Sequence, residues 1–538
     1  MDPRRINLIK AIFIIVIAVV TYVMLDRILL LKSEDGIEQI KAMYQQEEDS
    51  IDVLFVGTSH TYCHANTGLL WSEFGISAYN LGGAEQPYWN TYYYIKEALK
   101  TQRPDLIAFE FTGPGTIQTQ YQNENWFVTN NYGLKRNANR YESMKVSSAA
   151  SDFPKRLIPL NIIHGRYADL TADDFIDKDN TINFKGFDPR ETLVRFDTPQ
   201  LGATNERAPL LEKEEVWLRR LIEYVQSEEI PLLLFCSPYY ITPEDQALYN
   251  TVYDIAAEYE VPCVDFNLFY NEMNLDFATD MAEELHLNRV GNAKFSLFLG
   301  AFLQNVYDIA DHREEGTSKD SIYYSWNREA LYQQQSNASW YIRNVYHPDK
   351  YFTLFLDDTV PEINEYMTNY DPSKDDEIND DPVYEDGLIR YFMPKKENYI
   401  VFVQIAPETT SISEELLEKL SAIGISDPVP GGAYALCDGE VLFFDDTNSF
   451  SYTYYDQKNR ITLSRVPSDD SGKMKAVYSP EYRTSVRILG DVIPLDKEEV
   501  AITVYDKVLH KLVDNLVIGT DPDSYYIRHN EIEPDEIE

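Results

Sequence analysis

Short apolar runs alternate with amphipathic stretches between residues 50 and 308. Strings of four to six apolar residues are typical of buried strands, and the longer stretches repeat their apolar positions at helical spacing. The alternation predicts a mostly parallel sheet covered by helices on both faces, an α/β domain, in which active groups gather at the carboxyl ends of the strands. The expected strands are 53–56, 78–81, 106–111, 232–236 and 261–266, and the expected helices are 89–100, 214–227 and 243–259.

The N-terminal apolar segment predicts a membrane anchor over residues 1–35. Residues 11–25 are almost wholly apolar, and residues 28–31 resume the run after Asp26 and Arg27. Together they match the thickness of a bilayer. A cleavable signal peptide is the competing interpretation, but no small-x-small cleavage site follows. We therefore expect one transmembrane helix in the cell membrane, with its basic end cytoplasmic and the bulk of the chain extracytoplasmic.

Residues 117–208 form an insertion without a regular period. Long insertions of this kind are commonly lids or binding loops. Within it, His164 and Arg166 are candidates to hold an anionic or carbonyl group of a substrate. A surface ion pair and a hydrogen-bonded loop histidine are the alternatives.

The pattern changes after residue 308. The polar segment 309–338 predicts a linker, residues 339–525 predict a second, largely antiparallel domain, and 526–538 form an acidic tail. The acidic run 371–386 is typical of a solvated loop. Only one helix, 412–423, interrupts the β pattern. The expected strands are 399–405, 433–437, 441–444, 460–465, 486–489, 500–505 and 512–518.

Composition and charge restrict the partners. The 538 residues are 44% hydrophobic and 13% aromatic, which is typical of folded domains. The 47 basic and 89 acidic residues give a net charge of −42, which repels nucleic acid, so no nucleic-acid partner is expected. Cys236 and Cys263 lie in neighbouring apolar runs, where buried thiols are favoured over a disulfide. No Cys/His spacing is typical of a zinc site, and no metal or cofactor is expected.

Two separated motifs carry the candidate chemistry. The strand 53–56 runs into Gly57-Thr58-Ser59-His60, and far downstream stands Glu283-Glu-Leu-His286-Leu-Asn288. A serine on a turn after a buried strand is where an α/β fold exposes a nucleophile, and an acid three residues before a histidine can orient the base. Ser59, His286 and Glu283 thus form a candidate catalytic triad. Each motif alone has a structural alternative: a common turn, and a helix capped by Asn288.

These motifs resemble the SGNH/GDSL hydrolase superfamily over about residues 50–306. The resemblance also includes the segment Tyr79-Asn-Leu-Gly82-Gly83, which lies between the two motifs, and Gly291, which follows the second. The nearest likeness is to its membrane-anchored bacterial branch, which modifies surface polysaccharides and teichoic acids. The resemblance implies a flavodoxin-like SGNH sheet, Ser59 as nucleophile, His286 as general base and Glu283 as its orienting acid. It also implies that the backbone of Gly82 or Gly83 contributes to the oxyanion hole.

The chain departs from the superfamily pattern in two places. Glu283 stands where aspartate is usual, and Asp280 is an alternative orienting acid. The third-block asparagine is absent, because the chain reads Glu110-Phe-Thr-Gly after the strand 106–111. Another oxyanion donor is then needed, and Gln86, Asn90 and the Ser59 amide are the candidates. Losing one such donor typically costs roughly 10²- to 10³-fold in rate.

The C-terminal domain resembles the interleukin-like EMT inducer (ILEI/PANDER) domain over about residues 340–522. The likeness rests on the helix after a strand and on the Val504-Tyr505-Asp506 strand. It implies a binding or spacing role, and a plain β scaffold is the alternative.

Two functions follow for the whole chain. The first is a membrane-anchored serine esterase or O-acyltransferase, acting on acyl, chiefly acetyl, groups of a cell-envelope glycan and served by a multispanning membrane acyltransferase. The second is a catalytically inactive SGNH-fold protein that binds or assembles surface glycan.

Overall fold

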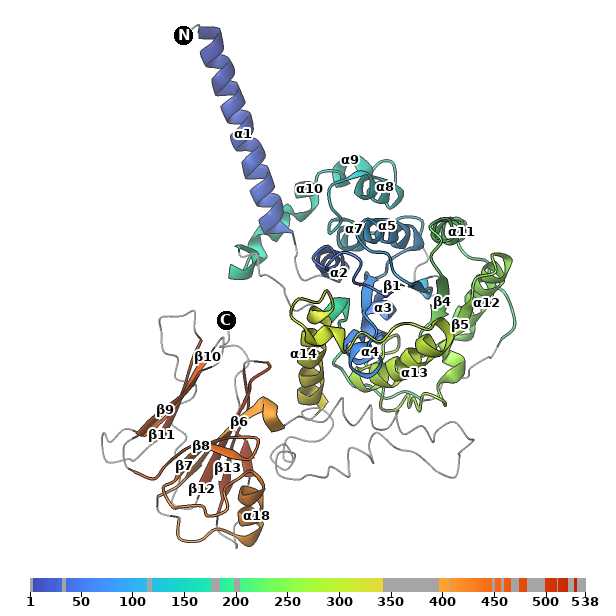
Figure 1. Ribbon diagram of the computed structural model, residues 1–538. Helices are drawn as coiled ribbons and strands as arrows, with labels where there is room; N and C mark the ends of the chain where they lie inside the picture. Colours follow the sequence, from blue (N-terminus) through green and yellow to red (C-terminus); the bar gives the residue numbers. More distant parts are fainter. Residues whose placement is uncertain are drawn as a thin grey trace. The chain divides into compact units, whose positions relative to one another are not determined.

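The computed structural model divides into two compact units (Figure 1). Described residues up to Ala330 form the first unit, and those from Leu331 onward form the second. The structure describes residues 3–30, 35–113, 119–175, 184–197, 204–341, 396–407, 409–447, 450–455, 459–465, 474–480, 499–509, 511–520 and 527–529.

A five-stranded sheet forms the centre of the first unit, in the order β2-β1-β3-β4-β5 with every neighbouring pair parallel. This is the flavodoxin-like order, in which the chain reverses direction across the sheet between β1 and β3. The prediction of a parallel α/β sheet is confirmed. The strands are β1 (Val53–Gly57), β2 (Ala78–Gly82), β3 (Leu106–Glu110), β4 (Leu232–Cys236) and β5 (Cys263–Asp265).

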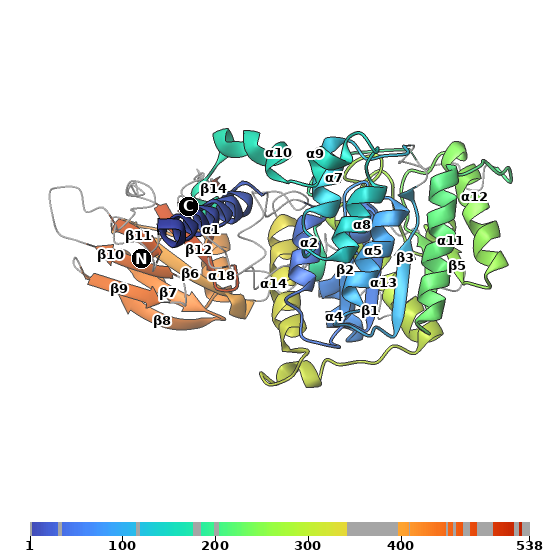
Figure 2. The ribbon, with the colours of Figure 1, turned by 90° about the horizontal axis from the view of Figure 1, so that it is seen from above.

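Helices cover both faces of this sheet (Figures 1 and 2). Alternate residues of β1 point to opposite faces: Leu54 and Val56 join the core beneath α5 (Tyr88–Ala98) and α11 (Glu212–Ser227). Phe55 instead meets Phe235, which contacts Phe266 against Phe295. The helices α3 (Ser59–His64), α4 (Thr67–Phe74) and α13 (Arg289–Tyr307) pack together. Pro243 at the first turn and a Thr242–Asp245 capping box begin α12 (Pro243–Glu258).

One N-terminal helix, α1 (Pro3–Leu29), contains a 21-residue segment, Ile9–Leu29, that is long and apolar enough to cross a membrane. Most of its apolar side chains are exposed, but Leu29 packs in a small core with Phe127, Tyr132 and Ile163. This core belongs to the insertion, whose described residues up to 163 form four helices: α7 (Glu124–Asn131), α8 (Ala138–Val146), α9 (Phe153–Arg156) and α10 (Leu160–Ile163). Its described residues 187–197 and 204–208 contain no helix. The short helix α2 (Ile37–Met43) follows α1.

The segment 309–338 differs from the expected linker because it contains most of α14 (Tyr324–Tyr341). In the first unit, the Trp326 side chain lies in the core, where its Nε1 donates to the Ala78 carbonyl, 3.2 Å away. Glu329 pairs with Lys185 at 3.2 Å. The polar composition of the segment concealed these few large contacts.

The second unit is a β structure. A six-stranded antiparallel sheet has the order β14-β13-β12-β6-β7-β8, and a second sheet has the order β11-β10-β9. Ile461 and Leu463 of β10 share a core with Phe402 and Ala435. The bounds are β6 (Tyr399–Ile405), α18 (Glu414–Ala422), β7 (Ala433–Cys437), β8 (Glu440–Asp445), β9 (Phe450–Tyr455), β10 (Asn459–Arg465), β11 (Met474–Pro480), β12 (Glu499–Asp506), β13 (Lys511–Gly519) and β14 (Ile527–His529). The expected strand 486–489, the acidic run 371–386 and the tail beyond 529 lie outside the described residues.

The four cysteines are free thiols. Cys236 and Cys263 lie on the adjacent strands β4 and β5 but are offset in register, since Cys263 is opposite Leu234. Burial raises the pKa of both thiols, so neither is a reactive thiolate.

Candidate active site

Ser59 lies at the carboxyl end of β1, at the first residue of α3. Gly57 has φ of 144°, and a Cβ there would come within 2.4 Å of the Glu110 carbonyl oxygen, so glycine is required where β1 passes β3. Thr58 caps α3, its Oγ1 accepting from the His60 amide at 3.4 Å. The tight turn presents the half-buried Ser59 at the edge of the sheet.

The structure brings Ser59, His286 and Glu283 together in a chain of contacts. His286 Nε2 lies 2.8 Å from Ser59 Oγ, and His286 Nδ1 contacts Glu283 Oε1. The hydrogen bond from His286 lowers the pKa of Glu283, which is therefore an anion near neutral pH. Because the Glu283 carboxylate accepts a hydrogen bond from Nδ1, that nitrogen keeps its proton and Nε2 is free to accept the proton of Ser59. This is the arrangement that activates a serine.

The start of α13 fixes the loop that carries His286. Asn288 caps this helix, accepting from the amides of Val290 and Gly291 and donating to the Thr279 carbonyl at 2.8 Å. A Cβ on Gly291 would come within 2.3 Å of the Asp280 carbonyl oxygen. The capping role considered for Asn288 is thus real, and the cap serves to position His286.

Asp280 is not available to orient His286. It is fully buried, and its Oδ2 lies 2.8 Å from Lys294 Nζ and accepts from the Asp276 amide. Glu283 is therefore the acid of the candidate triad.

A second, buried network supports the same loop and was not foreseen from the sequence. His64 Nε2 accepts from the Leu287 amide at 3.1 Å, which places a proton on Nδ1, 2.8 Å from Ser237 Oγ. Ser237 Oγ in turn lies 3.4 Å from Glu110 Oε1. The network connects the ends of β3 and β4 to the residue after His286. A histidine five residues after Ser59, on the same short helix, was its only signal in the sequence.

Glu110 is the last residue of β3. It is fully buried, and its carboxylate accepts from Thr112 at 2.7 Å and from the Ser237 amide at 3.3 Å. Burial raises the pKa of Glu110 to about 7, although these hydrogen bonds oppose the shift. His60 Nδ1 lies 3.7 Å away, and burial followed by the proximity of His286 keeps the pKa of His60 well below its ordinary value. The cluster beside the triad is therefore close to neutral.

The candidate donors to the oxyanion differ in whether their N–H groups are already hydrogen-bonded within the chain. The Gly83 amide donates to the Gly57 carbonyl at 3.2 Å, and a Cβ on Gly82 would come within 2.8 Å of the Thr58 carbonyl oxygen. The Gln86 side chain is bound by Asn130 and Thr91.

Asn90 is equally committed, because its amide nitrogen donates to Ser143 Oγ at 2.8 Å and to Asn131 Oδ1 at 3.2 Å. These bonds tie α5 to α7 and α8, which is a structural role. The Ser59 amide differs from the other candidates: it is the first of α3, so no carbonyl of the helix can accept from it.

His164 and Arg166 lie near α1 and not with the triad. His164 Nδ1 is 3.0 Å from the Leu160 carbonyl oxygen. Arg166 donates to the Ile28 carbonyl at 3.3 Å and pairs with Asp174. Within the described part of the chain, neither has a contact with Ser59 or His286. Arg166 does form an ion pair, but the Arg166 and Asp174 side chains are only 17% and 6% exposed, so the pair is not the surface one that the sequence suggested as an alternative.

No family model matches the chain, and no curated protein matches it. Among solved structures, it is similar to a protein from Desulfitobacterium hafniense DCB-2 described as lipolytic and of the G-D-S-L family, at 11% identity and a TM-score of 0.25, covering 47% of this chain and 98% of that one. It is also similar to a gut microbial diltiazem-metabolizing enzyme, at 14% identity and a TM-score of 0.19, covering 47% of this chain and 48% of that one. At these scores neither likeness bears on the function. Fold and site together define the class as a flavodoxin-like α/β protein with a serine–histidine–glutamate cluster at the carboxyl edge of its sheet.

Proposed function

We propose that the chain is a membrane-anchored serine esterase or O-acyltransferase. The observation that carries the proposal is the 2.8 Å contact between Ser59 Oγ and His286 Nε2, with Glu283 on the opposite ring nitrogen. Hydrogen-bonded serine, histidine and acid in this order are the machinery of acyl transfer.

Each step of the proposed reaction uses these groups. Ser59 Oγ attacks the acyl carbonyl carbon while its proton passes to His286 Nε2, and Glu283 stabilises the imidazolium. The Ser59 amide donates to the oxyanion. When the tetrahedral intermediate collapses, the leaving oxygen takes the proton from His286 and the acyl group remains on Ser59. Water, or a sugar hydroxyl activated by His286, then attacks the acyl-enzyme and releases Ser59.

The proposed substrate is an acylated, chiefly acetylated, polysaccharide or teichoic acid of the cell envelope. Two observations support this class: the resemblance of the motifs to surface-glycan enzymes, and the apolar helix α1, which would hold the domain at a membrane. If the acyl group is transferred and not hydrolysed, a multispanning membrane acyltransferase is the partner that would supply it.

One specific observation favours a second function, a catalytically inactive glycan-binding or assembly protein. Gln86, Asn90 and the Gly83 amide are all engaged elsewhere, so the Ser59 amide would act without a side-chain oxyanion donor. The loss of one donor typically costs roughly 10²- to 10³-fold, which slows an esterase without abolishing it.

The test is hydrolysis of small acetyl esters and acetyl release from acetylated envelope glycan by the purified full chain. We expect turnover that Ser59→Ala and His286→Ala each abolish, while Ser72→Ala on the neighbouring helix α4 leaves it unchanged. Glycan binding without turnover of any ester by the wild type would establish the binding protein instead.

A further inference from the structure

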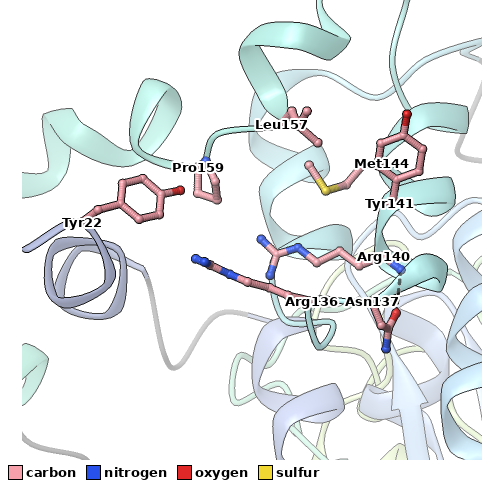
Figure 3. A pocket seen from close by; sticks show the side chains of 8 residues that line it. All are labelled: Tyr22, Arg136, Asn137, Arg140, Tyr141, Met144, Leu157 and Pro159. Carbon is pink, nitrogen blue, oxygen red and sulfur yellow. Dashed lines mark hydrogen bonds between the residues drawn. The ribbon is translucent and has the colours of Figure 1, made fainter. Parts of the chain in front are cut away.

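A cavity of about 300 Å³ lies between the C-terminal third of α1 and helix α8 (Figure 3). Two arginines, Arg136 and Arg140, reach into it, and Tyr22 of α1 faces them. The remaining wall is mostly apolar and is formed by Asn137, Tyr141, Met144, Leu157 and Pro159.

The charges in this cavity do not balance. Arg136 forms an ion pair with Asp26 of α1. Arg140 is only 9% exposed, and its Nη1 donates to the carbonyls of Tyr132 and Leu134. Its guanidinium also lies over the Tyr132 ring, with Cζ 5.1 Å from the ring centroid. In the described part of the chain no carboxylate forms an ion pair with Arg140, although the charge of Asp26 acts on it. Burial and the neighbouring Arg136 lower the pKa of Arg140. Two cations and one anion leave a net charge near +1 facing the cavity, which one bound anion would neutralise.

The cavity lies at one end of the apolar helix. Tyr22 lies two helical turns before Leu29, the last residue of the segment Ile9–Leu29 that could cross a membrane, and Asp26, the partner of Arg136, lies one turn nearer that end. The Arg136–Asp26 pair is therefore closer to the headgroup layer than Tyr22 is. The rim is apolar and exposed, since Tyr141 is 43% and Leu157 is 45% exposed. Guanidinium groups inside with apolar side chains at the rim fit an amphipathic ligand better than a free ion.

The local sequence has the same character. The whole chain has 47 basic and 89 acidic residues, but residues 135–166 contain seven basic and two acidic ones. An acidic protein thus has a basic segment where its apolar helix joins the folded unit. Basic clusters next to a membrane helix attract anionic lipids.

We propose that the Arg136/Arg140 cavity binds the phosphate of an anionic phospholipid headgroup, with the acyl chains passing over Tyr141 and Leu157. The two guanidinium groups are the phosphate donors, and the single negative charge of a phosphodiester balances the cavity. The inference depends on α1 lying in a membrane but not on the esterase activity, so the two proposals fail independently.

The test is native mass spectrometry of the full chain in detergent with added phosphatidylglycerol or phosphatidylcholine. We expect phosphatidylglycerol to be retained in preference to phosphatidylcholine. Arg136→Gln and Arg140→Gln should each reduce retention about fivefold. Lys145→Gln removes the same charge from the same helix, outside the cavity, and should change nothing. Asp26→Asn frees Arg136 and should increase retention, which a merely structural role of these residues would not produce.

Equal retention of the two lipids by the wild type would overturn the proposal, and so would retention of phosphatidylglycerol by the arginine variants equal to that by the wild type. Displacement of phosphatidylglycerol by inorganic phosphate at equal concentration would also overturn it, because the cavity would then bind free phosphate. Arg140 also binds two backbone carbonyls, so thermal unfolding of each variant is measured in parallel. Should Arg140→Gln unfold, Arg136→Gln and Asp26→Asn still decide the matter, because their expected effects have opposite signs.

Discussion

At the scale of single residues, Glu283 carries an orienting role that no neighbour can assume. Asp280 is held by Lys294, so only water can replace the Glu283 carboxylate. We predict that Glu283→Ala reduces kcat/KM for an acetyl ester by about 10²- to 10⁴-fold, less than Ser59→Ala does. The exposed neighbour Glu284 is the matched control, and Glu284→Ala should be neutral. Equal activity of the two variants would exclude Glu283 from the mechanism.

Glu110 makes stability depend on pH. Its pKa is raised from an ordinary 4.5 to about 7 in the folded chain, so between these values the folded state keeps a proton that the unfolded state releases. The stability contribution of Glu110 therefore falls as pH rises from 4.5 to 7, by up to ~3 kcal/mol at about 1.4 kcal/mol per pKa unit.

Glu110→Gln removes this titration. Relative to the wild type, the variant should gain stability between pH 4.5 and pH 7.5, as measured by urea unfolding at several pH values. Glu142→Gln, at an exposed position, is the control and should give a flat difference. If the difference in stability between Glu110→Gln and the wild type does not change with pH, folding does not raise the pKa of Glu110 and the prediction is wrong.

The sequence reveals the triad because each half of it is local: Ser59 follows its strand directly, and Glu283, His286 and Asn288 lie within six residues. The supporting network could not be found in this way. His64, Ser237 and Glu110 belong to three separate segments that meet only when β1, β3 and β4 align their carboxyl ends. For the same reason, Asn90 was a plausible oxyanion donor until its contacts with α7 and α8 were known.

At the scale of elements, the first part of α14, up to Ala330, belongs to the core of the first unit although the sequence of the helix is polar. We predict that Trp326→Ala lowers the stability of this unit by about 3–5 kcal/mol, the usual cost of removing a buried tryptophan. Thermal unfolding of the full chain measures the effect. Lys319→Ala, an exposed substitution in the same segment, should change stability by less than about 0.5 kcal/mol. Similar small effects of both variants on stability would mean that the segment 309–338 is a linker, as the sequence predicts.

Strong period-2 and apolar patterns predicted β6, β7, β12 and β13, which are buried on their described faces. The strands β9, β11 and β14 were missed, and β14 (Ile527–His529) lies within the segment 526–538 that was expected to be an acidic tail. The segment of β9, Phe450–Tyr455, is rich in tyrosine and serine. Apolar and polar positions differ little in such a sequence, so the alternation typical of a strand is weak. Helix α8 was missed because its sequence, with Asn139, Arg140 and Lys145, resembles a solvated loop.

At the scale of the whole molecule, we propose that the bulk of the chain lies outside the cytoplasm. The basic residues that precede the apolar segment of α1 favour a cytoplasmic N-terminus. Protease added to intact cells should therefore digest most of the chain, while a cytoplasmic marker protein stays intact. Protection of the bulk of the chain until the cells are lysed would reverse the assigned orientation.

The central claim is that His286 activates Ser59, and covalent labelling tests it most directly. The full chain is treated with a fluorophosphonate, and the modified peptide is identified by mass spectrometry. We predict that label appears on Ser59 alone, and that both His286→Ala and prior denaturation prevent it, because an unactivated serine does not react. An unlabelled wild type, or labelling of Ser59 that persists in His286→Ala, would contradict the account.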